Sequence, residues 1–282
     1  RSILFIPVHA LRKQQQIPAL GKLQRVCYNN SIMKNYIVFD LEWNQSANGK
    51  EKSIPHFPFE IIEIGAVKLN EAFQMTDEFH RLIRPQVYTQ MHHAISEVTH
   101  MNMKELQKDG NLFPDAAAEF LSWCGEDAVF CTWGNMDLLE LQRNMDFYHM
   151  ENPFPKPLFY YDVQKLYGLF CRDNARISLD SAVEEQQLME ARPFHRALDD
   201  AYYTGKLLTM LGNTPGPEMI LPFLSVDYYR LPSNRKEEIR ITFPGYSKYV
   251  SRVFDTKEDA MASKNVTEMM CYRCGRMLRK KV

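Results

Sequence analysis

The sequence has no long apolar run, few cysteines and no excess of charge of either sign. No stretch approaches the ~20 consecutive apolar residues that a membrane-spanning helix needs, so we expect no contact with a membrane. Only 6 of the 282 residues are cysteine and they are scattered, which excludes a dense disulfide framework and favours the reducing cytoplasm. The 34 basic and 35 acidic residues leave a formal net charge of -1, so any binding of nucleic acid must depend on a local patch or on metal ions.

Acidic residues are missing altogether from residues 1–32, which include three consecutive glutamines at 14–16. Met33 then opens a segment that runs directly into an apolar strand. We therefore expect residues 1–33 to be an N-terminal extension that is not part of the fold. An ordinary flexible tail, a mis-called start and a basic targeting segment all fit this composition.

The chain is 45% apolar, with 17 Phe and 14 Tyr, which is ample for a packed core. Short apolar runs and helical periodicity predict strands at 36–41, 61–69, 75–83, 128–132 and 159–163, and helices from 114 and at 137–147, 178–188 and 199–211. A three-stranded meander followed by alternating helices and strands indicates an α/β fold with a mixed five-stranded sheet flanked by helices. Pro215, Pro217 and Pro222 interrupt this pattern, so we expect one domain over residues 34–214 and a small C-terminal appendage over 215–282.

Two carboxylates stand at the end of the first predicted strand. Asp40 and Glu42 are two residues apart, and this spacing puts both side chains on one face of a strand. Two adjacent ionised carboxylates repel each other, so a hard divalent cation such as Mg²⁺ or Mn²⁺ is their natural partner. The pair alone is a weak signal, because a solvated strand end could have the same sequence. The apolar run 37–39 before it argues against that alternative.

Three further candidates occur later in the chain. Asp137 follows Thr-Trp-Gly at the start of a predicted helix, where it could equally be a carboxylate that interacts with the helix dipole. His195 and Asp200 are five residues apart, which on one continuous helix separates them by roughly 140°. They can converge if His195 lies in a loop and the helix starts near it, as Pro193 allows. Asp199 is the alternative partner, and a capping histidine is the alternative role.

Together and in this order, these residues resemble the motifs of the DnaQ-like exonuclease superfamily, in its DEDDh branch. The sequences Thr-Trp-Gly-Asn-Met-Asp at 132–137 and His-Arg-Ala-Leu-Asp-Asp-Ala at 195–201 are similar to the ERI/KapD-type subgroup. The resemblance covers residues 34–212 and implies an RNase H-like fold. It also implies a 3′–5′ exonuclease that shortens single-stranded 3′ ends, with RNA favoured, and releases nucleoside 5′-monophosphates.

The resemblance also assigns a role to each residue. The ligands of two divalent ions, Mg²⁺ or Mn²⁺, would be Asp40, Glu42, Asp137 and Asp200. The general base would be His195. Two such ions would stabilise the attacking and leaving oxygens at phosphorus, and would let a protein without excess positive charge hold a polyanion. Two other functions stay open, namely a DNA proofreading or repair exonuclease and a catalytically silent nucleic-acid-binding module.

Substrate contacts are less clearly marked. Many relatives have Thr after the Asp-x-Glu pair where this chain has Trp43, which could stack on the terminal base or pack against the neighbouring loop. The segment 92–99 resembles the family segment that lines the 3′-terminal nucleotide, and Ile95 and Thr99 are its candidate contacts. A capped helix start at Ser96 is the alternative interpretation of this segment.

Near the C-terminus, Cys271 and Cys274 have the Cys-x-x-Cys-Gly spacing of a zinc knuckle. Only this pair is present and no histidine follows His195, so a tetrahedral zinc site would need two ligands from elsewhere or from a second chain. Two free thiols are the alternative that the sequence favours. A basic run around the pair, ending in Lys280 and Lys281, could contact phosphates, although such runs are more often only solvated.

Overall fold

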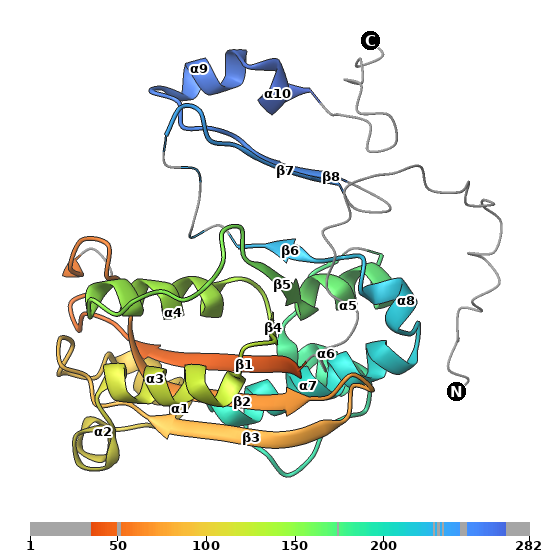
Figure 1. Cartoon of the computed structure of the whole chain (residues 1–282). Coiled ribbons are helices and arrows are strands. Elements are labelled where there is room, and N and C mark those ends of the chain that lie inside the picture. Colours follow the sequence, from red (N-terminus) through yellow and green to blue (C-terminus); the bar gives the residue numbers. More distant parts are fainter. Residues whose placement is uncertain are drawn as a thin grey trace. The chain divides into compact units, whose positions relative to one another are not determined.

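The computed structural model describes residues 35–49, 52–173, 175–227, 229, 232, 234–242 and 247–268 (Figure 1). The predicted extension, residues 1–33, lies outside these described residues, and so do Cys271, Cys274 and the end of the basic run. Within the described part, no helix is both long enough and apolar enough to cross a membrane.

A mixed sheet of six strands, in the order β3-β2-β1-β4-β5-β6, is the centre of the fold. Its strands are β1 Asn35–Asn44, β2 Glu60–Leu69, β3 Met75–Leu82, β4 Ala128–Thr132, β5 Phe159–Asp162 and β6 Ser225–Val226. β1 pairs antiparallel with β2 and parallel with β4, and β4 pairs parallel with β5. The predicted α/β fold with a mixed sheet is confirmed. The predicted number of five strands is wrong, because β6 is only two residues long and has no periodic pattern in the sequence.

Eight helices precede or follow these strands in the part of the fold around the sheet: α1 His93–Thr99, α2 Met103–Asp109, α3 Phe113–Cys124, α4 Met136–Phe147, α5 Val163–Cys171, α6 Leu179–Glu185, α7 Ala197–Asn213 and α8 Pro217–Ile220. Of these, α3, α4, α6 and α7 were predicted, with boundaries that differ by a few residues. Later in the described residues, β7 Ile239–Thr242 and β8 Ser247–Val250 form an antiparallel pair, followed by α9 Lys257–Ala262 and α10 Lys264–Thr267.

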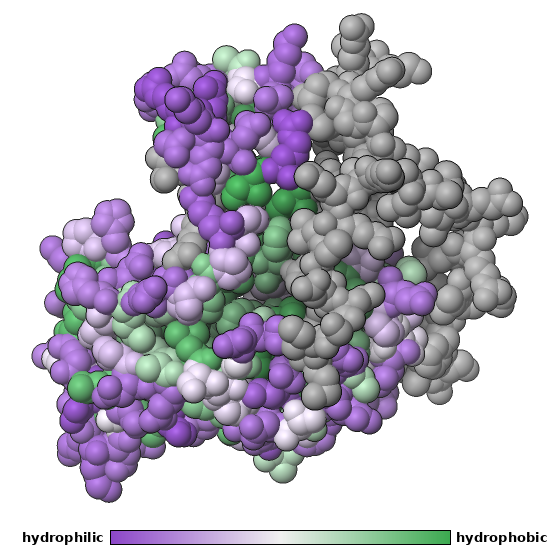
Figure 2. Space-filling model, in the orientation of Figure 1, coloured by the Kyte–Doolittle hydropathy of each residue, from purple (hydrophilic) through white to green (hydrophobic). Residues whose placement is uncertain are grey.

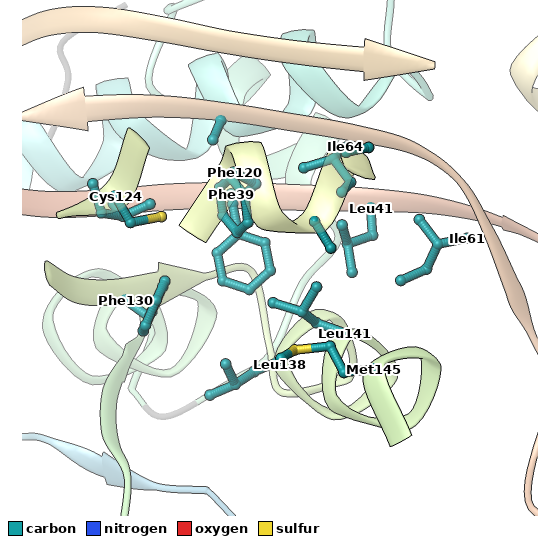
Figure 3. Close-up of a cluster of buried hydrophobic side chains, with 14 of the residues drawn as sticks. Phe39, Leu41, Ile61, Ile64, Phe120, Cys124, Phe130, Leu138, Leu141 and Met145 are labelled. Carbon is teal, nitrogen blue, oxygen red and sulfur yellow. The ribbon is translucent and has the colours of Figure 1, made fainter. Parts of the chain in front are cut away.

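Side chains of β1 alternate between two cores. Ile37, Phe39 and Leu41 are buried in a first core with side chains from α3 and α4 (Figure 3). Tyr36 and Val38 are buried in a second core with side chains from α5, α6 and α7. Asp40 and Glu42, the next even-numbered residues of β1, therefore point to the side of the sheet that α7 covers. Hydrophilic side chains cover much of the surface that Figure 2 shows.

The start of α7 lies very close to β2. Gly65 of β2 has no Cβ, and a Cβ added there would lie 2.0 Å from the backbone nitrogen of Leu198, in the first turn of α7. Gly65 is also the residue that pairs with Asp40 of β1. The missing side chain therefore lets the start of α7 approach the strand that carries the first two candidate carboxylates.

The segment after residue 214 begins with elements that still pack on the sheet. Ile220 of α8 is buried in the second core, and Val226 of β6 is buried beside β5. The backbone N–H of Asp227 donates to the carbonyl oxygen of Leu158 at 2.9 Å. The predicted boundary at residue 214 thus precedes the last residues that contact this fold, because prolines mark the end of a helix and not the end of packing.

Candidate active site

Asp40 and Glu42 lie on β1, near the middle of the sheet, on the face that α7 covers. Both side chains are half-buried. The register between β1 and β2 shifts between Glu42 and Trp43, which is the geometry of a β-bulge. Regular alternation along β1 therefore ends directly after the two carboxylates.

Asp137 lies in the first turn of α4, which follows β4 through a turn at Gly134. Gly134 has a φ of 106°, a left-handed conformation that glycine adopts without strain, and its carbonyl oxygen accepts the hydroxyl of Thr132 at 2.6 Å. The buried carboxylate of Asp137 accepts the backbone N–H of Leu41 at 3.2 Å. Leu41 lies between Asp40 and Glu42 in β1, so this bond places the Asp137 carboxylate next to the segment that carries these two carboxylates.

His195 lies in the loop before α7, with a φ of 65°, and α7 begins at Ala197. The backbone N–H of His195 donates to Oδ2 of Asp200 at 3.0 Å. The backbone of His195 therefore reaches the carboxylate of Asp200, as the sequence allows, because the helix starts after the histidine. Asp199, the alternative partner, is instead bound by Arg192 at 3.1 Å.

Carboxylate oxygens of Asp40, Glu42 and Asp200 all lie within 4.8 Å of one another. Asp137 adjoins this cluster through its bond to Leu41. Oδ1 of Asp200 is buried and has no hydrogen-bond partner among the described residues. Several hard oxygen donors, one of them unsatisfied, suit a divalent cation such as Mg²⁺ or Mn²⁺. The residues present thus fit the metal that the sequence predicts.

The same carboxyl groups hold their protons more tightly than usual. Burial, followed by the charges of Asp137 and Asp200, raises the pKa of Asp40 well above its ordinary value. Burial, followed by the charges of Asp200 and Glu63, raises the pKa of Glu42 to about 8. Burial also raises the pKa of Asp137 and that of Asp200 to about 7 each, although a backbone N–H bonded to each carboxylate acts in the opposite direction. A bound cation would stabilise the ionised forms of these carboxyl groups. The cluster therefore favours the binding of a positively charged ion.

A model of the exonuclease family (RNase_T) matches residues 37–208, a range that includes all five predicted acid and base residues. The chain belongs to this exonuclease family. The match also agrees with the mixed sheet flanked by helices, so the predicted RNase H-like fold and the predicted DnaQ-like superfamily are confirmed.

Some known proteins are similar to this chain in sequence and others in fold. The exonuclease is 28% identical over 176 residues to KapD, a probable 3′-5′ exonuclease of Bacillus subtilis (strain 168), and the match covers 62% of this chain and 83% of KapD. The nuclease domain of 3′hExo, a DEDDh family member, aligns with a TM-score of 0.55 and 21% identity over 71% of this chain and 98% of that one. Cell-death related nuclease 4 aligns with a TM-score of 0.56 and 14% identity over 73% of this chain and 68% of that one. The protein is therefore an enzyme of the DnaQ-like 3′–5′ exonuclease superfamily, whose members use divalent metal ions.

Metal binding should stabilise the exonuclease most at alkaline pH. The pKa of Glu42, about 8, and those of Asp137 and Asp200, about 7, exceed the values of an unfolded chain. These three carboxyl groups therefore stabilise the folded state fully below pH ~4, and this stabilisation is lost as the pH rises through their pKa values in the folded protein.

We expect the metal-free enzyme to unfold at a lower temperature at pH ~8.5 than at pH ~6. Saturating Mg²⁺ should raise that temperature by about 5–10 °C at the higher pH, measured by thermal scanning. A Mg²⁺ effect that is absent, or equal at the two pH values, would contradict this view of the cluster.

The predicted substrate contacts lie on β1 and α1. Trp43 has a packing contact, because its ring centroid is 5.4 Å from that of Phe59 and it packs against the first core. Thr99 is buried, and its hydroxyl donates to the carbonyl oxygen of Ile95 at 2.8 Å within α1. Contact of Trp43, Ile95 and Thr99 with a substrate stays a prediction.

Glu63 of β2 is one residue at this site that was not predicted. It is buried and binds the first residues of α7 through Arg196 and Ala197. Burial raises the pKa of Glu63, but hydrogen bonds from His80, Arg196 and the N–H of Ala197 outweigh burial and lower that pKa below its usual value. The available signal was a glutamate inside the apolar run Ile-Ile-Glu-Ile, which is unusual for a buried strand.

Asn44, the last residue of β1, was not predicted either. Its buried side chain donates from Nδ2 to the carbonyl oxygens of Tyr88 at 2.8 Å and Gln90 at 2.9 Å, and its Oδ1 accepts the N–H of His92 at 3.0 Å. Asn44 thereby fixes the loop that leads into α1 to the strand that carries the carboxylates. In the sequence it looks like a turn residue at the start of a polar loop, so nothing distinguishes it.

Proposed function

We propose that this enzyme hydrolyses single-stranded nucleic acid from its 3′ end, with RNA favoured, and releases nucleoside 5′-monophosphates in a metal-dependent reaction. The observation that carries the proposal is the cluster of Asp40, Glu42 and Asp200 oxygens within 4.8 Å, to which the backbone N–H of His195 is bonded through Asp200. A silent binding module is the weaker alternative, because repulsion among half-buried and buried carboxylates destabilises a fold that has no use for them.

The proposed ligands of two divalent ions, Mg²⁺ or Mn²⁺, are Asp40, Glu42, Asp137 and Asp200. When bound, two such ions stabilise charge on the attacking and leaving oxygens of a displacement at phosphorus. The protein's part is to hold the carboxylates in place from β1, α4 and α7. Backbone N–H groups already fix Asp137 and Asp200, so these two side chains are oriented before any ligand arrives.

His195 is the proposed general base. His195 is exposed, and its backbone N–H donates to the carboxylate of Asp200. A histidine can accept a proton from water near neutral pH. In the proposed step, the water oxygen bonds to phosphorus as the proton passes to the imidazole. The bond between phosphorus and the 3′ oxygen of the preceding nucleotide then breaks, and this oxygen takes up a proton from solvent, which leaves a shortened strand with a 3′ hydroxyl.

Two structural neighbours support RNA as the favoured substrate. The nuclease domain of 3′hExo was solved with rAMP, and a 3′-exonuclease with a TM-score of 0.55 was solved in a study of 3′-end recognition of a histone mRNA stem-loop. DNA is the rival substrate, since E. coli exonuclease I, solved with a dA16 oligonucleotide, aligns with a TM-score of 0.52. The cytoplasmic location expected from the scattered cysteines stays a prediction.

A matched pair of 5′-labelled oligonucleotides, one RNA and one DNA of the same sequence, tests the choice of substrate. With Mn²⁺ present, we expect RNA to be shortened at least about tenfold faster, as a site that bound the 2′ hydroxyl of RNA would discriminate strongly against DNA, which lacks it. Excess chelator should stop both reactions. Faster shortening of the DNA would instead favour the proofreading or repair type of exonuclease.

A further inference from the structure

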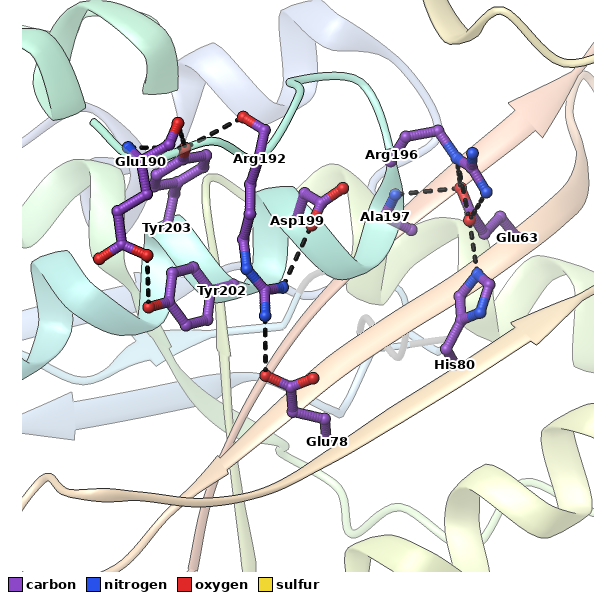
Figure 4. Close-up of polar contacts among 10 residues, drawn as sticks. All are labelled: Glu63, Glu78, His80, Glu190, Arg192, Arg196, Ala197, Asp199, Tyr202 and Tyr203. Atoms are coloured by element: carbon purple, nitrogen blue, oxygen red, sulfur yellow. Dashed lines mark hydrogen bonds and ion pairs between the residues drawn. The ribbon is translucent and has the colours of Figure 1, made fainter. Parts of the chain in front are cut away.

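A fully buried carboxylate on β2, that of Glu63, binds the entry of α7. Nε2 of His80 lies 2.6 Å from Glu63, Nη2 of Arg196 donates to it at 2.8 Å, and the backbone N–H of Ala197 donates at 3.0 Å (Figure 4). A buried carboxylate with this many donors is a strong local constraint, because neutralising it leaves charged or polar donors without their partner.

The residues that Glu63 binds come directly after His195. Arg196 is the N-cap residue of α7, and Ala197 is its first residue. His195 has a φ of 65°, a conformation that a residue other than glycine keeps only when its surroundings hold it. The carboxylate of Asp200 accepts the N–H of His195, and the carboxylate of Glu63 binds the next two residues.

We infer that Glu63 is a positioning residue for His195, acting through Arg196 and Ala197 and touching neither metal nor substrate. This inference rests on the proposed role of His195 as general base. The imidazole can be reproducibly aimed at a water only if the backbone of the loop is fixed. A displacement of ~1 Å at a reacting group can lower the rate about 100-fold.

Glu78 provides a matched control. It lies on β3 and binds Arg192 at 3.3 Å, so it also ties the sheet to the segment that enters α7 (Figure 4). Its side chain is 40% exposed, however, and its partner is further from His195 in the chain. Exposed ion pairs contribute little, so Glu78→Gln should leave both kcat and KM unchanged.

The test is a double-mutant cycle of Glu63→Gln and His195→Ala in the full chain, with 5′-labelled single-stranded RNA and Mg²⁺. We expect Glu63→Gln to lower kcat about 10- to 100-fold with KM nearly unchanged. In the double variant, kcat should equal that of His195→Ala alone, because Glu63 then has no base left to position.

Losses that multiply in the double variant would overturn the inference, since Glu63 would then act on the fold or on the carboxylates. An unchanged kcat in Glu63→Gln would overturn it as well. Full activity in His195→Ala has a different meaning. That result would show that His195 is not the general base, and the inference would then fail together with the proposed function.

Thermal unfolding and Mg²⁺ calorimetry check that Glu63→Gln folds. If it does not fold, Arg196→Lys enters the same cycle with the same expected outcomes, because it keeps the charge and loses the planar two-nitrogen contact.

Discussion

Asp40→Asn should abolish cleavage, with kcat lower by at least about three orders of magnitude, while binding of single-stranded RNA survives. Oxygens of Asp40 lie within 4.8 Å of oxygens of both Glu42 and Asp200, so its charge is shared by the whole cluster. Asparagine keeps the shape of aspartate and removes the charge that a divalent cation needs. Binding should survive because less negative charge favours a polyanion. Steady-state cleavage and fluorescence anisotropy of a labelled oligonucleotide measure the two effects.

Asp199→Asn is the matched control for this experiment. It makes the same chemical change next to Asp200, but Arg192 binds the Asp199 carboxylate at 3.1 Å and the residue is not part of the cluster. We expect activity close to that of the unaltered enzyme. Equal activities in Asp40→Asn and Asp199→Asn, or cleavage that persists in excess chelator, would refute the proposed metal site.

Gly65→Ala should lower kcat about 100-fold and the free energy of unfolding by about 1–3 kcal/mol. The added Cβ would lie 2.0 Å from the backbone nitrogen of Leu198, and a helix backbone cannot yield as the end of a side chain can. Asp40 pairs with Gly65, whereas His195 and Asp200 belong to the start of α7. Moving α7 outward therefore separates two parts of one site.

Gly205→Ala is the control for close packing without a role at the site. A Cβ there would lie 2.8 Å from the Cγ2 atom of Val67, which is a side-chain atom on β2 and not the backbone of a helix that carries site residues. We expect Gly205→Ala to lower the free energy of unfolding while kcat is kept. Chemical denaturation and steady-state kinetics on both variants give the comparison. If Gly65→Ala also keeps its kcat, the close approach of α7 to β2 does not determine the geometry of the site.

The placement of the five candidate acid and base residues could be predicted because local rules determine it, whereas their roles stay a prediction. The two-residue period of a strand puts Asp40 and Glu42 on one face, and the end of β4 brings Asp137 to the start of a helix. The pairing of His195 with Asp200 depends on where α7 starts. Pro193 favours a start after His195, and Ala197 is the first helical residue. The family resemblance then supplied what no single motif could, namely their combined order.

Features that depend on distant parts of the chain could not be predicted. Glu63 binds Arg196 and Ala197 across 133 and 134 residues of sequence, and nothing near Glu63 indicates those partners. The role of Gly65 depends in the same way on a helix backbone that follows much later. β6 was missed for another reason, since two residues are too few to show a period.

The proposed activity of the carboxylate cluster is the removal of nucleotides one at a time from a 3′ end. The most direct measurement is the order in which products form from a 5′-labelled single-stranded RNA with Mg²⁺. We expect a ladder of labelled strands that shortens from the 3′ end, together with nucleoside 5′-monophosphates. Internal fragments at the earliest times, or immediate release of the labelled mononucleotide, would contradict it.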